Sequence, residues 1–246
     1  MRAALVAVLA LLAIARDSGA EPPAEPPPMR PASIGAPMDG VLVGGAVLPK
    51  RGAGFAVMQK TLERRARFGT EELVRLVESA AARVRRQHRG AELAVADLSQ
   101  RRGGPFVHHG SHQSGRDVDL AFYMRDAAGE PVRPLDFVAF DRNGFSVDPP
   151  MAYRFDVARN WAVVAALLTS DRAEVQWIFV AEHLKRLLLE HADAAGAPAD
   201  LVAAARRALR QPGAKSHWDH FHVRIRCPGE PGGACRDARS ARAGGR

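Results

Sequence analysis

Two short segments, far apart in the chain, hold most of its histidines and constrain how it can fold. One lies around residues 108–119 and the other around 217–222, and together they contain six of the nine histidines. A hydrolytic zinc site needs three protein ligands, usually imidazole or carboxylate, and one position left open for water. Histidines scattered as solvent-facing polar residues would not gather in this way. The sequence therefore predicts a fold that brings the two segments together as a metal or catalytic site.

The hydrophobic pattern places both segments on strands. Every second residue of 118–124 is apolar, so this strand has one apolar face, and Asp117 and Asp119 lie on the opposite face. The same alternation recurs in the second segment, where His220 and His222 share the polar face. We therefore expect these carboxylates and imidazoles to project from polar strand faces.

The ordered pair of motifs, His-x6-Asp followed far downstream by His-x2-His-x-His, resembles that of the LAS metallopeptidases. Within them the chain is most similar to the penicillin-insensitive murein endopeptidase family. Similar text extends over about residues 32–235, and includes Gly110–Gly115, Asp117–Asp119 and His222–Pro228. The strand and helix patterns, with this resemblance, predict an α+β fold in which helices flank a small, mostly antiparallel sheet that carries a zinc site.

The resemblance implies a role for each residue of the two motifs. His112, Asp119 and His222 would be the ligands of one Zn²⁺ per chain, since imidazole and carboxylate suit this ion. His217 and His220 would lie beside the metal as catalytic residues, one as general base and the other stabilising the oxyanion. Which of them is the base is left open, as is the alternative that either one only orients a ligand.

Some members of the family carry an accessory metal site. Two of its ligands match His109 and Asp141, whereas the position of the third is Gly144 in this chain. Asp117 shares a strand face with Asp119, so it is expected to hydrogen-bond a metal ligand.

Three residues near the first motif are candidates for positioning the substrate. Ser111 and Gln113 are expected to position the substrate amide or His112, and Gly115 to form the tight turn before the strand. Arg116 stands where the family often has an apolar residue, and two readings are equally open: contact with a substrate carboxylate, or simple exposure to solvent.

The reaction implied by the resemblance is hydrolysis of the D-alanyl–meso-diaminopimelyl cross-link of peptidoglycan by a metal-activated water, insensitive to penicillin. Two alternatives remain open at this point. One is a LAS-type D,D-carboxypeptidase or dipeptidase, which would release free D-Ala from monomeric stems. The other is a cell-wall-binding module that keeps a zinc ion without catalysis. A Hedgehog-like signalling domain is more remote.

The chain divides into four parts. Residues 1–20 have one arginine, a short apolar run and small residues at the end, as in a secretory signal peptide, which predicts a periplasmic or secreted protein without a transmembrane span in the mature chain. Residues 21–32 form a Pro-rich linker, 33–235 a single catalytic domain, and 236–246 a basic disordered tail. Cys227 and Cys235 are the only cysteines. Export favours a disulfide between them, with free thiols as the alternative.

Periodicity predicts further elements around these motifs. A helix is expected from Thr70, its N-cap, to His88. A strand that contains Leu93 and Val95 should pair near the strand that carries Asp119. Further expected elements are helices at 155–169, 181–195 and 199–209, a buried strand at 175–180, and a surface connection at 126–150 that shapes a substrate groove.

The net charge of +8 and the pI of about 10.4 favour an anionic partner. No platform of basic residues interleaved with aromatic ones is visible, and an exported protein rarely meets nucleic acid, so nucleic acid is not expected as a partner. Peptidoglycan suits the predicted compartment better.

Overall fold

The computed structural model describes residues 32–213, 217–229 and 234–237. The predicted signal peptide, nearly all of the linker and most of the tail therefore lie outside the described residues. The helices are α1 (Gln59–Glu63), α2 (Glu71–Gln87), α3 (Val157–Leu168), α4 (Glu182–Ala194) and α5 (Ala199–Ala208). The largest sheet contains β4 (Arg51–Gly52), β5 (Phe55–Val57), β7 (Leu93–Val95), β8 (Asp117–Ala121), β12 (Val175–Phe179), β13 (Leu209–Arg210) and β14 (His220–Ile225).

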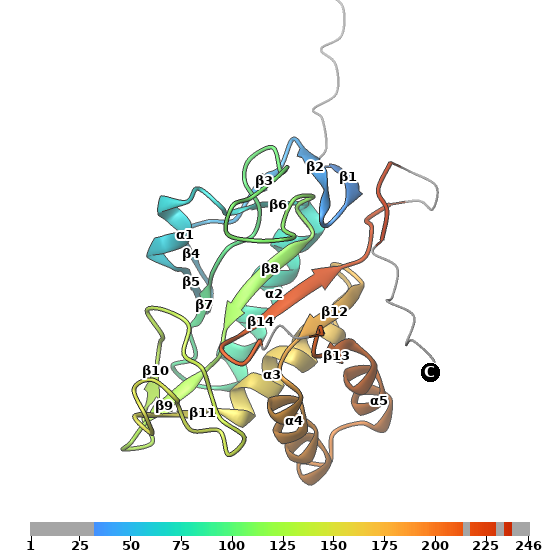
Figure 1. Ribbon diagram of the computed structural model, residues 1–246. Coiled ribbons are helices and arrows are strands. Elements are labelled where there is room, and N and C mark those ends of the chain that lie inside the picture. The colour runs from blue at the N-terminus through green and yellow to red at the C-terminus, as the bar shows by residue number, and fades with distance from the viewer. Residues whose placement is uncertain (1–31, 214–216, 230–233, 238–246) are drawn as a thin grey trace, which may run out of the picture.

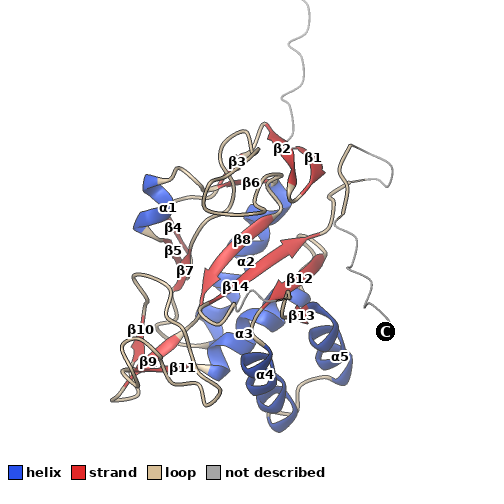
Figure 2. Cartoon of the chain, in the orientation of Figure 1, coloured by secondary structure: helices blue, strands red, loops and turns tan. Residues whose placement is uncertain are grey.

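Shorter strands form three small sheets around this central one. They pair β1 (Ala32–Ala36) with β2 (Asp39–Val43), β3 (Ala46–Val47) with β6 (Phe68–Gly69), and β9 (Met124–Asp126) with both β10 (Pro131–Val132) and β11 (Tyr153–Phe155). The central sheet has the order β13-β12-β14-β8-β7-β5-β4, in which only β12/β13 and β5/β7 are parallel. The predicted α+β fold with a mostly antiparallel sheet is thus confirmed (Figure 2).

The central sheet has a helical side and a polar side. Helix α2 lies behind β8 and β14, and α3 packs against α2, α4 and α5 (Figure 1). Val118 and Leu120 of β8, and Phe221 and Val223 of β14, are fully buried in the main core. Burying such a side chain contributes about 1.5–3 kcal/mol, so these alternating positions fix which face of each strand turns toward the helices. The polar residues are thereby left on the other face.

The four predicted helices, α2 to α5, agree with the sequence pattern to within two residues at each end, whereas α1 was not predicted. Thr70 caps α2 as predicted, since its Oγ1 accepts a hydrogen bond from the N–H of Leu73 at 3.3 Å. The cap of α3, Asp156, was not predicted; its carboxylate accepts from the N–H of Arg159 at 3.2 Å. No helix in the described part of the chain has the length and apolar character needed to cross a membrane.

A disulfide joins Cys227 and Cys235, with an Sγ–Sγ distance of 2.11 Å, so the predicted pairing is confirmed. The segment after it returns to β1, because the N–H of Gly35 donates to Ala234 O and the N–H of Arg236 donates to Gly35 O. These contacts include Arg236, which lies one position past the domain boundary expected at 235.

Candidate functional site

The register of two central strands brings the two histidine segments together. In the antiparallel pair of β8 and β14, His222 lies opposite Asp119, and Arg224 lies opposite Asp117. Directly opposed residues on one face have Cβ atoms about 4.5–5.5 Å apart, so their side chains meet. The predicted polar faces are thus one continuous surface.

The loop before β8 adds His112, whose orientation is fixed from its backbone outward. Its φ of 66° lies in the left-handed region, which costs energy for a residue other than glycine. The backbone is held there by two contacts: its carbonyl accepts from Ser99 Oγ at 2.6 Å, and its N–H donates to Asp117 Oδ2 at 3.3 Å. The ring Nδ1 donates to Leu98 O at 2.6 Å, so Nε2 is the nitrogen that faces Asp119. The turn into β8 then uses Gly115, at φ 73°, as predicted.

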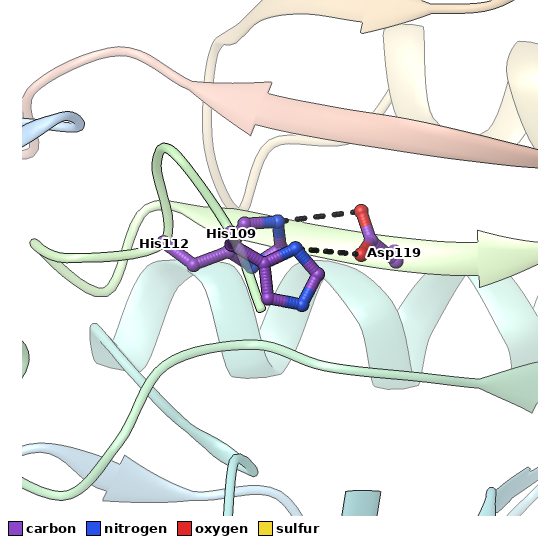
Figure 3. A group of neighbouring side chains, drawn as sticks. All are labelled: His109, His112 and Asp119. Carbon is purple, nitrogen blue, oxygen red and sulfur yellow. Dashed lines mark ion pairs between the residues drawn. The ribbon is translucent and has the colours of Figure 1, made fainter. Parts of the chain in front are cut away.

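Four imidazoles converge on the carboxylate of Asp119. Its Oδ1 lies 3.3 Å from His112 Nε2, 3.4 Å from His222 Nδ1 and 3.5 Å from His220 Nε2. Its Oδ2 lies 3.7 Å from His109 Nδ1. Figure 3 shows His109 and His112 pointing their ring nitrogens at the two oxygens of this carboxylate. Such an arrangement concentrates electron-pair donors around one point.

Two polar atoms of this cluster lack a hydrogen-bond partner within the described part of the chain. His112 Nε2 and Asp119 Oδ1 are buried and have no hydrogen-bond partner among the described residues. Leaving a buried polar atom unpaired costs about 1–3 kcal/mol, which a bound cation would remove. The donor atoms of His109, His112 and Asp119 lie within 4.8 Å of one another, so this group could hold a metal ion. A donor set of imidazole and carboxylate suits zinc and similar transition metals.

Asp117 orients His222 from behind. Its Oδ1 accepts from His222 Nε2 at 2.8 Å and from Arg224 Nε at 2.6 Å. The hydrogen bond predicted between Asp117 and a neighbouring candidate ligand is present. With Nε2 of His222 engaged in this way, its Nδ1 is the nitrogen that faces Asp119.

The electrostatics of the cluster keep the carboxylates ionised. Burial opposes ionisation of Asp119, but the facing His112 and His220 hold its pKa well below the usual range. Burial also opposes protonation of His112, yet the charge of Asp119 raises the pKa of His112 to about 9. For His222 burial prevails and lowers the pKa to about 4, so this ring is neutral near pH 7 and able to bind a metal.

The cluster opens onto a cavity of about 820 Å³. His217 and His220 both line it, with ring centroids 5.3 Å apart. The Nδ1 of His220 lies 2.7 Å from Asp219 Oδ1, and the ring stacks on Phe137 with centroids 4.3 Å apart. Phe137 comes from the 126–150 connection, which thus contributes to the cavity as expected. Other predicted site residues on its wall are His109, Ser111, Asp119 and His222.

The sequence did not predict Asp97, which holds His109 at the cavity wall. This carboxylate is almost fully buried, and it accepts from Thr61 Oγ1 and Arg64 Nη1, each at 2.8 Å. Its Oδ2 also lies 2.9 Å from His109 Nε2, so the other nitrogen of His109 turns to Asp119. The available signal was an acidic residue within the apolar run that follows Leu93.

Arg116 corrects one expectation. Its side chain is fully buried, and its guanidinium donates to Ser33 Oγ, to Asp237 Oδ1 and to the carbonyls of Ile225 and Arg236. It is not exposed to solvent, and it is not among the described residues that line the cavity. It ties the C-terminal segment to the start of β8.

Two other candidates lie away from the cavity wall. Gln113 uses its backbone, with its N–H donating to Pro37 O and its carbonyl accepting from Gly104. The Oδ1 of Asp141 accepts from the N–H groups of Asn143 and Phe145, at 2.8 and 2.9 Å, and so stabilises a turn. Neither residue is among the described residues that line the cavity.

Comparison with known proteins indicates the family of this chain. Residues 33–245 match the family described as penicillin-insensitive murein endopeptidase. This chain belongs to that family. The match spans both histidine segments, so the predicted family is confirmed.

Individual relatives are similar over most of their length. A penicillin-insensitive murein endopeptidase of Klebsiella pneumoniae (strain 342) is 30% identical over 240 residues, which cover 93% of this chain and 79% of the relative. One from Escherichia coli (strain SE11) is 29% identical over 237 residues, covering 94% and 80%. One from Pectobacterium atrosepticum is 30% identical over 204 residues, covering 81% and 66%.

Proposed function

We propose that this chain is an exported, zinc-dependent endopeptidase that hydrolyses the D-alanyl–meso-diaminopimelyl cross-link of peptidoglycan. The observation that carries the proposal is the buried Asp119 carboxylate with three imidazole nitrogens within 3.5 Å of one oxygen, at the floor of an open cavity. The names of the relatives supply the substrate class. The signal-peptide pattern of residues 1–20 supports a periplasmic or secreted location.

His112 Nε2, Asp119 and His222 Nδ1 are the proposed metal ligands. Zn²⁺ held there would supply Lewis-acid chemistry for the scissile carbonyl and would lower the pKa of water to about 7. We prefer His222 to His109 as the third ligand because His222 lies on a central strand and its ring is held by Asp117. His109 lies on a loop, its other nitrogen engaged by Asp97, and is proposed only as an accessory ligand. Asp141, which stabilises a turn away from the cavity wall, is not proposed as its partner.

His220 is the proposed general base and His217 the proposed group that stabilises the oxyanion. The contact with Asp219 places the proton of neutral His220 on Nδ1, so Nε2 can accept a proton from water at the cavity floor. His217 has a φ of 38°, a left-handed conformation of the kind that accumulates at functional sites, and its ring centroid lies 5.8 Å from that of His222. Ser111, on the cavity wall, is proposed to contact the substrate amide. No side chain is acylated in this chemistry, so penicillin is not expected to inhibit it.

The test is digestion of purified cross-linked muropeptide dimers by the mature chain, with products read by mass. We expect conversion of dimers to monomers that is abolished by a chelator and by His222→Ala, and unaffected by penicillin. His191→Ala, the same change on α4, is the matched control and should retain activity.

Other outcomes would contradict parts of the proposal. Release of terminal D-Ala alone would assign the chain to the carboxypeptidases. Wall binding with one bound metal and no turnover would leave a binding module. Turnover that survives complete removal of the metal would refute the metal-dependent chemistry.

A further inference from the structure

Among the described residues, three side chains with a full positive charge line the cavity, and two of them are already neutralised. Arg64 is bound to the buried Asp97 at 2.8 Å, and Arg224 to the buried Asp117 at 2.6 Å. Because Asp97 and Asp117 are buried, removing either arginine would leave an uncompensated buried charge, so neither arginine can exchange its carboxylate for that of a ligand. The third cation, Lys60, is held differently.

Lys60 is paired with a carboxylate that remains in water. Its ammonium contacts Asp136, whose side chain is 74% exposed, while the Lys60 side chain itself is 23% exposed. An ion pair with one partner in solvent contributes little to stability. Asp136 can therefore give up the ammonium to a second carboxylate in the cavity at little cost.

The ammonium is also fixed in direction. It lies 3.8 Å from the centroid of the Phe137 ring, and this ring stacks on His220. A cation over an aromatic face is attracted by the ring, which limits the motion of an otherwise flexible lysine. Lys60 is thereby held one aromatic ring away from the proposed general base.

We propose that Lys60 binds the carboxylate of the residue on the leaving-group side of the scissile bond. The inference rests on the proposed function, because in the D-alanyl–meso-diaminopimelyl linkage the carbon bearing the scissile nitrogen also bears a free carboxylate. That carboxylate lies next to the bond being cut, so the site needs an available cation close to its base. Lys60 is the cavity cation, among the described residues, that meets this requirement, and it makes the site selective for a free carboxylate over its neutral amide.

The test compares two dimers that differ in one group. One carries the free carboxylate at that carbon, and the other carries the corresponding amide. We expect wild-type kcat/KM to be about tenfold higher for the free carboxylate, the effect of one charge-assisted contact at a partly exposed site. Lys60→Met, which keeps the apolar stem, should remove this preference by raising KM for the acid while leaving the amide unchanged. Lys60→Arg should restore the preference.

Lys185→Met is the matched control, since Lys185 is also a surface lysine paired with an exposed carboxylate, that of Glu182, but lies on α4 outside this cavity. Binding of both dimers to the metal-free protein is measured in parallel. If wild type binds and cleaves acid and amide equally, or if Lys60→Met keeps the preference, the role of Lys60 is refuted. If neither dimer is cleaved, the proposed function fails. The role of Lys60 is then decided by binding alone: wild type should bind the acid more tightly than the amide, and Lys60→Met should bind both equally.

Discussion

Asp117 offers the sharpest test of how the site is held together. It is fully buried, and its carboxylate accepts hydrogen bonds from His222, from Arg224 and from the backbone of His112. In Asp117→Asn the buried Arg224 loses its counter-charge, which predicts a loss of about 3–5 kcal/mol in the free energy of unfolding. His222 also loses the carboxylate that fixes its tautomer and direction, which predicts a 10–100-fold loss of metal affinity, a typical effect for such a partner.

A matched variant distinguishes the loss of stability from the loss of metal affinity. Asp156 is likewise buried and paired with two arginines, Arg125 at 2.9 Å and Arg159 at 2.6 Å, but it caps α3 far along the chain from the cluster. Asp156→Asn should lower stability by a similar amount and leave metal affinity unchanged. Stability is measured by denaturant unfolding of the metal-free proteins, and affinity by competition with a chromophoric chelator. Wild-type metal affinity in Asp117→Asn would refute the claim that this carboxylate orients a ligand.

Four further predictions concern protons, the disulfide and the buried arginine. The pKa of His112 is raised to about 9 without metal, so metal binding at pH 7 should release about one proton. Metal affinity should therefore rise about tenfold per pH unit up to about pH 9. Calorimetry in buffers of different ionisation enthalpy measures the proton release. The metal-free protein should show the opposite trend, losing stability as pH rises from the unfolded value of 6.5 through about 9, since a raised pKa stabilises the fold only while the group is protonated. Cys227→Ser with Cys235→Ser opens a loop of sequence separation 8 and should cost on the order of 2–3 kcal/mol in thermal unfolding. Arg116→Met should release the C-terminal segment to limited proteolysis while metal affinity stays at the wild-type value.

The strand faces were predictable because burial decides them. Every second residue of β8 and β14 is apolar, and a one-residue slip would expose the whole set, so the polar faces followed directly. The long helices were predictable for a similar reason, since each carries an apolar stripe and α2 also carries a capping threonine. These local patterns located Asp119 and His222 on their strands before any contact was known.

Contacts between distant segments were not predictable in this way. Lys60 lies on a five-residue helix with no apolar stripe of its own, and its partner Asp136 is 76 positions away. Arg116 stands at the start of a strand, where an arginine usually reaches water. Its burial depends on Asp237, 121 positions later, in a segment that the sequence pattern placed outside the domain. The sequence left solvent exposure and substrate contact equally open for Arg116, whereas tertiary contacts bury it.

The register of β8 against β14, which creates the site, was predictable only in part. Period-two alternation puts both His220 and His222 on the polar face of β14, and it permits either of them to stand opposite Asp119, since a shift of two residues preserves every face. The structure selects His222, which places Arg224 against Asp117. If His220 stood opposite Asp119 instead, His222 would stand opposite the buried Asp117, and Arg224 would lose its counter-charge. A buried carboxylate without its cation is far more costly than one hydrogen bond, so the Arg224–Asp117 pair favours the register that brings His222 to Asp119. The charge pair behind the site thus helps to decide which histidine becomes the candidate ligand.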